Sequence, residues 1–209
     1  IRKGSGRMSE PVFNSALAHI AERDGAKGLN IAMREIADRG MIDLRGEAST
    51  AKFKQAVKAV LGVDLPTRPR TSASKGNIAV FWLSVDQWLI SCPRGDQGKL
   101  AADLKTALGN LHALVADVSD MRTIIRLEGE HVREVLMNGS SVDFTMPEYK
   151  EGAVRRLVFA EIAALAHIVS QTPDIVDLYV VRSYADYTWK WLAATAKPGA
   201  TIGLFSKAG

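Results

Sequence analysis

The sequence predicts an α+β protein with two split-βαβ (ferredoxin-like) modules in tandem, each a mainly antiparallel sheet with helices packed on one face. Strand-like and helix-like segments of the first half follow in the order β, α, β, β, α, β, which is the order of such a module. The second half repeats this order. Each half also ends its first strand with Leu, any residue, Gly and Glu, at 44–47 and 127–130. Because Leu44 and Leu127 are equivalent and 83 positions apart, we interpret the halves as a structural duplication.

Three regions are expected along the chain of 209 residues. Residues 1–28 form an N-terminal tail and docking segment, residues 29–118 the first module and residues 119–209 the second. Residues 1–7 ("IRKGSGR") resemble a vector-derived remnant, which makes Met8 the expected native initiator. A chain of this length with 47% hydrophobic residues has room for one or two cores.

The first elements follow from the spacing of apolar residues. Phe13, Leu17 and Ile20 share one helical face ahead of two glycines, which predicts a short helical turn that serves as the docking segment. The segments "LNIAMREI" (29–36) and "MIDLRGE" (41–47) are expected to be strands. The second of these leads into the first long helix.

Two amphipathic helices are expected in the first module. One lies in "STAKFKQAVKAVLG" (49–62), where Ser49 or Thr50 caps the start and Gly62 ends the helix. The other begins after Asp96, a further capping residue. The apolar stripes of the two helices are Phe53, Val57, Val60 and Leu61, and Leu100, Leu104, Leu108 and Leu111.

The strands between and after these helices are rich in β-branched and aromatic residues. The segments at 77–84 and 87–92 flank the turn "SVDQ" and predict a hairpin. Trp82 and Trp88 are expected to face each other across it and to belong to the core. A strand at 113–120 closes the module.

The second module is expected to repeat the first. The alanine-rich run within it is also compatible with a helix, and a helix there would contradict the duplication. The expected elements are a strand at 121–130, a helix at 131–139, two hairpin strands at 156–170 and 175–183 joined by "QTPD", a helix at 185–196 and a last strand at 200–206.

Catalytic, cofactor-binding and metal-ligating residues are not expected in this chain. The sequence lacks the dinucleotide fingerprint, the P-loop, the zinc-protease motif and the hydrolase nucleophile motif. Its four histidines are far apart, without the spacing of a local metal site. Cys92 has no second cysteine near it, so a small buried residue is expected rather than a nucleophile. Asp117 and Asp120 are candidates for an acid/base pair. A turn in which the Asp120 side chain hydrogen-bonds its own backbone explains Asp120 more simply.

Composition excludes several classes of partner. The formal net charge of +4 falls to +1 when Arg2, Lys3 and Arg7 of the remnant are set aside, and no basic stripe remains for nucleic acid. The longest apolar run, 157–169, is shorter than the roughly 20 residues of a membrane span. A single cysteine fits a reducing cytoplasm.

Two groups of residues are candidates for contact with a partner. The connector "VDLPTRPRTS" (63–72) places two prolines and Arg68 and Arg70 between a predicted helix and a predicted strand, in a stiff loop that loses little entropy on docking. The segment "YADYTWKWLA" has more aromatic residues than one buried stripe accommodates, so part of the aromatic surface is expected to be exposed. Its aromatic residues are Tyr184, Tyr187, Trp189 and Trp191.

Four segments of the sequence resemble a known family. They are "LGVDLPTRPRTS", "WLSVDQWLI", "ADVSDMRTIIRLEG" and "LYVVRSYADYTWKWL", and the last is the most specific. Across residues 29–196 the chain resembles the gamma subunit of heterotetrameric sarcosine oxidase. The gamma subunit in turn resembles the folate-binding domain of glycine-cleavage aminomethyltransferases, whose paired βαββαβ modules agree with the duplication.

The resemblance implies a subunit of a bacterial flavoenzyme that oxidatively demethylates sarcosine to glycine. The one-carbon unit passes to tetrahydrofolate or leaves as formaldehyde, and oxygen becomes hydrogen peroxide. FAD, FMN, NAD, zinc and tetrahydrofolate are expected in the other subunits, and the isolated chain is expected to be inactive. The implied partners are the alpha, beta and delta subunits, with alpha in direct contact through the loop of Arg68 and Arg70.

Two other readings stay open. A stand-alone folate-binding protein related to the iron-sulfur-assembly aminomethyltransferase homologues has the same fold, but those proteins carry a Lys-Gly-Cys-Tyr type signature. Here the only cysteine lies in "ISCPRG". An aminomethyltransferase is the other reading, and it requires a polar central pocket with an acid that orients folate.

Overall fold

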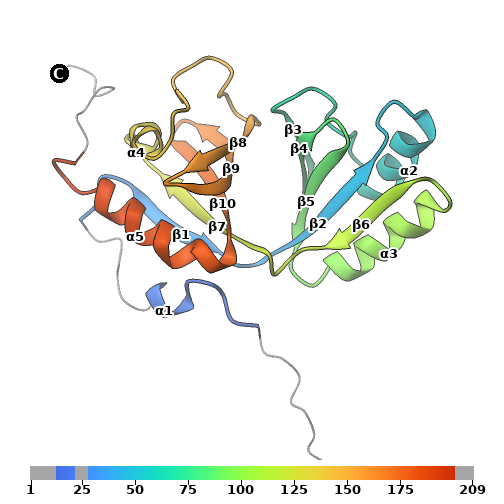
Figure 1. Cartoon of the computed structure of the whole chain (residues 1–209), viewed down its shortest axis with the longest axis horizontal. Helices are drawn as coiled ribbons and strands as arrows, with labels where there is room; N and C mark the ends of the chain where they lie inside the picture. Colours follow the sequence, from blue (N-terminus) through green and yellow to red (C-terminus); the bar gives the residue numbers. More distant parts are fainter. Residues whose placement is uncertain (1–12, 22–27, 201–209) are drawn as a thin grey trace, which may run out of the picture.

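The computed structural model describes residues 13–21 and 28–200, and its frame is two five-stranded antiparallel sheets. The sheets stand side by side with helices on their outer faces (Figure 1). The predicted α+β class is therefore confirmed. Within the described residues, no helix is both long and apolar enough to cross a bilayer.

One sheet has the order β3-β4-β5-β2-β6 and comes from the first half of the chain. Its elements are β2 (Arg39–Gly46), α2 (Ala51–Leu61), β3 (Ser72–Lys75), β4 (Ile78–Ser84), β5 (Gln87–Pro93), α3 (Gln97–Leu108) and β6 (Ala113–Asp117). Phe53 and Val57 of α2 and Leu104 of α3 share one buried cluster with Trp88 of β5. Both helices therefore cover the same face, as predicted. Trp82 lies directly opposite Trp88, which is fully buried.

The other sheet has the order β1-β7-β10-β9-β8. Its elements, with the flanking helices, are α1 (Ala18–Ala21), β1 (Ala32–Ile36), β7 (Arg122–Glu128), α4 (Val132–Asn138), β8 (Val154–Phe159), β9 (Ile162–Gln171), β10 (Asp174–Val181), η1 (Arg182–Tyr184) and α5 (Ala185–Thr195). Val135 of α4 and Leu192 of α5 pack into one core with Leu127 and Leu178 of the sheet. Two helices again cover one face, so the arrangement occurs twice. Both halves run β-α-β-β-β-α, with one strand more between the helices than the predicted βαββαβ order.

The strand predicted at 29–36 forms as β1, but it pairs with β7 in the sheet of the second half. There β1 is the edge strand beside β7, just as β6 is the edge strand beside β2 in the other sheet. The last strand of the second module was predicted at 200–206. Its residues from 201 onward lie outside the described part of the chain. Strand composition predicts β1, but the choice of its partner depends on contacts far along the sequence.

The single strand predicted at 156–170 is wrong, because this segment is a hairpin of β8 and β9. Its tight turn is formed by Ala160 (φ 45°) and Glu161 (φ 68°), both in the left-handed region. Hairpin turns of this kind normally use Asn or Gly, so the sequence carries no turn signal here. The helical alternative for this run is also wrong. The short edge strand β3 was not predicted.

A two-stranded ribbon joins the sheets, since β1 continues into β2 and β6 into β7. Ile36 pairs with Ile124 on one side of the crossing, and the backbone N–H of Val118 donates to the carbonyl of Met41 (2.8 Å) on the other. The inner faces of the sheets meet in a third core. It contains Met41, Phe81, Leu83 and Leu89 of one sheet, and Ile124, Val154, Leu165 and Tyr179 of the other.

Candidate partner-binding site

The connector predicted as a contact loop is anchored at one end and exposed at the other. Leu65 and Pro66 are buried, and the indole N–H of Trp88 donates to the carbonyl of Pro66 (2.8 Å). Arg68 and Arg70 are exposed. Leu65 and Pro66 thus form a buried anchor, and the two arginines are exposed beyond it.

The same connector joins the two halves of the chain. The carbonyl of Arg70 accepts a hydrogen bond from the N–H of Val154 (3.0 Å), at the start of β8. The guanidinium of Arg70 also pairs with Glu148 (3.2 Å), with both side chains about half exposed. Arg70 is therefore partly engaged within the chain. The Arg68 guanidinium forms no hydrogen bond or ion pair with the part of the chain that the structure describes.

The aromatic residues of the last helix divide into buried and exposed members. Trp189 is 7% exposed and belongs to the core, whereas Tyr184 (49%) and Tyr187 (45%) are exposed. Trp191 is half-buried and packs edge-on against Phe159, with ring centroids 5.0 Å apart. The expectation that part of the aromatic surface remains exposed is met by Tyr184 and Tyr187.

A shallow groove of about 470 Å³ lies beside these rings. Val158 and Ala160 line it together with Tyr187 and Trp191. The hydroxyl of Tyr187 donates to the carbonyl of Ala160 (3.0 Å), the residue that follows β8. The connector with Arg68 and Arg70 (the arginine loop) and helix α5 (the aromatic helix) are therefore hydrogen-bonded to opposite ends of β8.

A second, polar cavity of about 360 Å³ opens between the inner faces of the sheets. Arg126, Asp177 and His167 lie side by side on three neighbouring strands. The guanidinium of Arg126 donates to both carboxylate oxygens of Asp177, at 2.6 and 2.7 Å. Sequence reasoning missed this row. Its signal was a polar residue at the same register position in each of three apolar strands.

Burial determines the protonation of this row. Desolvation lowers the pKa of His167 from 6.5 to about 4, so its imidazole is neutral at physiological pH. Desolvation also raises the pKa of the neighbouring Tyr179, and the phenol stays protonated. The hydrogen bond to Asp177 raises the pKa of Arg126. The cavity therefore presents a fixed ion pair and two neutral ring groups.

Cys92 is a buried free thiol. Burial raises its pKa, which disfavours the thiolate that a nucleophile or metal ligand requires. Among residues 13–21 and 28–200, no group of three or more His, Cys, Asp or Glu side chains has the geometry of a metal site.

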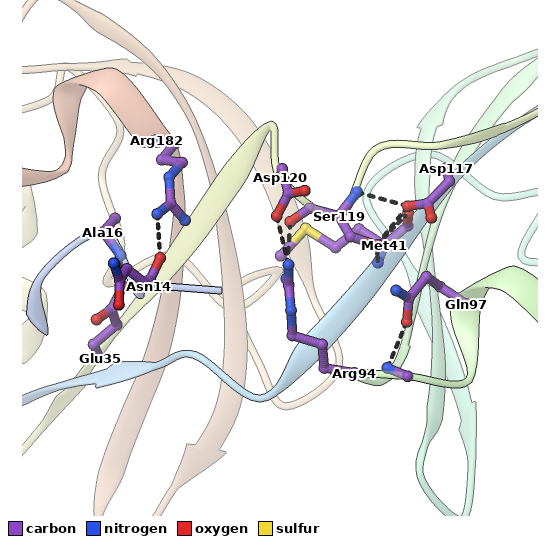
Figure 2. A network of polar contacts seen from close by, with 11 residues as sticks. Asn14, Ala16, Glu35, Met41, Arg94, Gln97, Asp117, Ser119, Asp120 and Arg182 are labelled. Atoms are coloured by element: carbon purple, nitrogen blue, oxygen red, sulfur yellow. Dashed lines mark hydrogen bonds and ion pairs between the residues drawn. The ribbon is translucent and has the colours of Figure 1, made fainter. Parts of the chain in front are cut away.

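The N-terminal segment docks where the ribbon crosses between the sheets. The guanidinium of Arg94 lies 3.5 Å from the ring centroid of Phe13, and that of Arg182 lies 5.6 Å away. Figure 2 shows Arg94 paired with Asp120 (2.5 Å), and Arg182 donating to the carbonyl of Asn14. Phe13 thus bridges residues from both halves.

Glu35 fixes the next turn of this segment. Its carboxylate accepts hydrogen bonds from the backbone N–H groups of Ala16 (3.1 Å) and Leu17 (3.2 Å) and from the hydroxyl of Thr123 (2.5 Å). Leu17 is buried in the core beneath. The described part of the N-terminal segment is therefore held by this chain itself.

Comparison with known proteins assigns the chain to a family. The model of the sarcosine oxidase gamma subunit family matches residues 45–197. The chain belongs to this family. It is 32% identical to sarcosine oxidase subunit gamma of Corynebacterium sp. (strain P-1), over 88% of this chain and 90% of that protein. A gamma subunit from Arthrobacter sp. is 27% identical over similar shares.

Solved structures show the same fold. A chain of heterotetrameric sarcosine oxidase from Corynebacterium sp. U-96 aligns with a TM-score of 0.80 at 24% identity, over 88% of this chain and 94% of that one. Aminomethyltransferase T of the Bartonella henselae glycine cleavage system aligns with a TM-score of 0.63 at 14% identity, over 85% of this chain and 56% of that one. At these identities the likeness concerns the fold alone.

Proposed function

We propose that this chain is the non-catalytic gamma subunit of a heterotetrameric sarcosine oxidase, and that it supports assembly of the flavoprotein that oxidatively demethylates sarcosine to glycine. The observation that carries the proposal is the 32% identity to a sarcosine oxidase subunit gamma across 90% of that protein. The assembly is an oxidoreductase that acts on CH–NH donors with oxygen.

In this proposal the redox chemistry belongs to the alpha, beta and delta subunits. They hold FAD, FMN, NAD, zinc and tetrahydrofolate, and alpha contacts this chain directly. The buried Cys92 thiol is consistent with a cytoplasmic assembly.

The contact surface combines the arginine loop with the aromatic helix. Arg68 and Arg70 offer forked hydrogen bonds to carboxylates or carbonyls, with Arg68 the less engaged of the two. Tyr184, Tyr187 and the edge of Trp191 supply the aromatic anchors that often dominate binding. Trp189 contributes by holding the helix to the core.

The test is to purify the isolated chain and to measure its absorbance spectrum, its flavin content and its oxidation of sarcosine. We expect a colourless chain with no bound flavin and no turnover, since the chemistry lies in the partners. Stoichiometric flavin, or turnover by the isolated chain, would reject the non-catalytic role.

The cavity between the sheets supports a second candidate, a stand-alone folate-binding or aminomethyltransferase-like protein. It has the volume of a small-ligand site and is lined by two carboxylates, Asp38 and Asp177. The Asp177 carboxylate is already held by Nε and Nη2 of Arg126, which weakens this candidate. Calorimetry of the isolated chain with tetrahydrofolate separates the two, because only the second candidate predicts heat of binding.

A further inference from the structure

The outer edge of β8 has backbone groups that no other strand uses. β8 is the last strand of its sheet and pairs with β9 alone. The N–H of Val154 bonds outward to Arg70, whereas the carbonyl of Ala153 bonds inward to the N–H of Ile168 (2.9 Å). Since bonding direction alternates along an antiparallel strand, the N–H and C=O groups of Arg156 and Val158 also point outward.

The arginine loop covers only the start of this edge. Thr71 forms a bridge with Ala153, and Arg70 forms the next bond, to Val154. At Arg70 the backbone is left-handed (φ 63°), which is incompatible with a continuing strand. Within residues 13–21 and 28–200, no backbone hydrogen bond reaches the outward groups of Arg156 and Val158.

Positive charge lies on β8 itself. Arg156 is exposed, and the Nε of Arg155 is buried without a hydrogen-bond acceptor. Among the described residues, neither of these two arginines forms an ion pair.

Beyond the arginines the edge becomes apolar. Val158 is 66% exposed and lines the 470 Å³ groove beside Tyr187 and Trp191. Large apolar side chains that are both exposed and contiguous with unpaired backbone are typical of a contact surface.

We propose that β8 is a docking edge for an extended segment of a partner subunit, which adds a sixth strand to this sheet. The segment carries a carboxylate side chain near Arg156 and an apolar side chain near Val158. Strand addition of this kind draws affinity from backbone hydrogen bonds and selectivity from side chains at alternate positions. The inference rests on the proposed function, which it deepens by naming the chemistry of the partner.

Charge favours a foreign strand over a second copy of this chain. Two β8 edges joined to each other would bring Arg155 and Arg156 of both copies together, and like charges on neighbouring strands are destabilising. A segment with a carboxylate beside Arg156 replaces this repulsion by a charge-assisted contact.

The test is hydrogen exchange at single-residue resolution on this chain, alone and in the complex co-expressed with its partner subunits. We expect the amides of Arg156 and Val158 to exchange at least about tenfold more slowly in the complex, because each gains a hydrogen bond. The amides of Arg155 and Leu157 already face β9 and serve as internal controls with little change.

A variant pair tests the same edge. Val158→Pro removes the outward N–H without breaking a hydrogen bond to β9 and should weaken complex formation about tenfold, whereas Val158→Thr keeps that N–H and should change it less than about threefold. If Val158→Pro does not unfold cooperatively like the wild type, the exchange data on the wild type decide alone.

Three outcomes are distinguishable. If the wild-type chain binds no partner subunit, the proposed function fails, and the docking edge with it. If the complex forms but the amides of Arg156 and Val158 exchange as in the free chain, the docking edge is wrong and the proposed function stands. Protection of these amides in the isolated chain, with a dimeric mass, would assign the edge to a second copy and overturn the proposal.

Discussion

The buried His167 should make the chain lose stability in mild acid. Its ring lies 4.8 Å from that of Phe81, and burial lowers its pKa from 6.5 to about 4. The unfolded chain binds a proton at His167 once the pH falls below 6.5, while the folded chain does so only near pH 4. The stabilising effect of the neutral imidazole is therefore fully present above pH 6.5 and is lost as the pH falls toward 4.

The size of this effect follows from the two pKa values. Between pH 7.5 and 4.5, the difference between 6.5 and about 4 corresponds to a loss of about 2.5 kcal/mol from the free energy of unfolding. Carboxylates also titrate in this range, so the wild-type curve alone is not sufficient. The difference between the wild type and His167→Gln isolates the histidine.

The assay is urea unfolding of both proteins at pH 7.5 and 4.5. We expect His167→Gln to lose about 2.5 kcal/mol less than the wild type over this interval. His112→Gln, which changes an exposed histidine, is the control and should follow the wild type. Parallel pH profiles for the wild type and His167→Gln would refute the claim that His167 is buried and neutral.

Three further predictions concern packing, charge and assembly. Asp177→Asn should lower the free energy of unfolding, measured in urea, by about 3 kcal/mol, because Arg126 loses its buried counter-charge. The double change Arg126→Met, Asp177→Leu should recover most of this loss. A double variant whose loss equals the sum of the two single losses would contradict the reasoning. Gly139→Ala should cost about 1–3 kcal/mol by thermal unfolding, since a Cβ there would lie 2.6 Å from the Phe159 ring and 2.9 Å from Trp191, whereas Gly98→Ala, with open space around it, should cost nothing. Arg68→Ala with Arg70→Ala should weaken co-purification with the alpha subunit by about 1–3 kcal/mol, and equal recovery with the control Lys52→Ala, Lys54→Ala would remove the loop from the interface.

Local patterns in the sequence were sufficient for most of the fold. The apolar stripe from Phe53 to Leu61 and the capping Gly62 specify a helix through short-range spacing alone, and Gly62 adopts the expected left-handed conformation (φ 69°). The equivalence of Leu44 and Leu127 was also visible in the sequence, and both residues are fully buried in central strands.

What the sequence left open depends on contacts between distant segments. β1 has the composition of a strand, but its pairing with β7 joins residues about 90 positions apart, and no local signal specifies that choice. The turn at Ala160 and Glu161 was hidden because neither residue is typical of a left-handed turn. The row of Arg126, Asp177 and His167 becomes visible only when three strands are aligned.

The residues proposed for the partner contact show the same limit. Composition predicted that an aromatic surplus would be exposed, but not that Trp189 would be buried and Tyr187 exposed. Nor did it predict that Arg70 would pair with Glu148. The outward groups of β8 were missed entirely, because β8 itself was not separated from β9.

The most direct test of the central claim is native mass spectrometry of the assembly, after co-expression of the alpha, beta and delta subunits with and without this chain. We expect one copy of this chain in each flavin-containing complex, and a clear loss of recovered complex and of sarcosine turnover when it is omitted. Full recovery and full turnover without this chain would contradict its role in assembly.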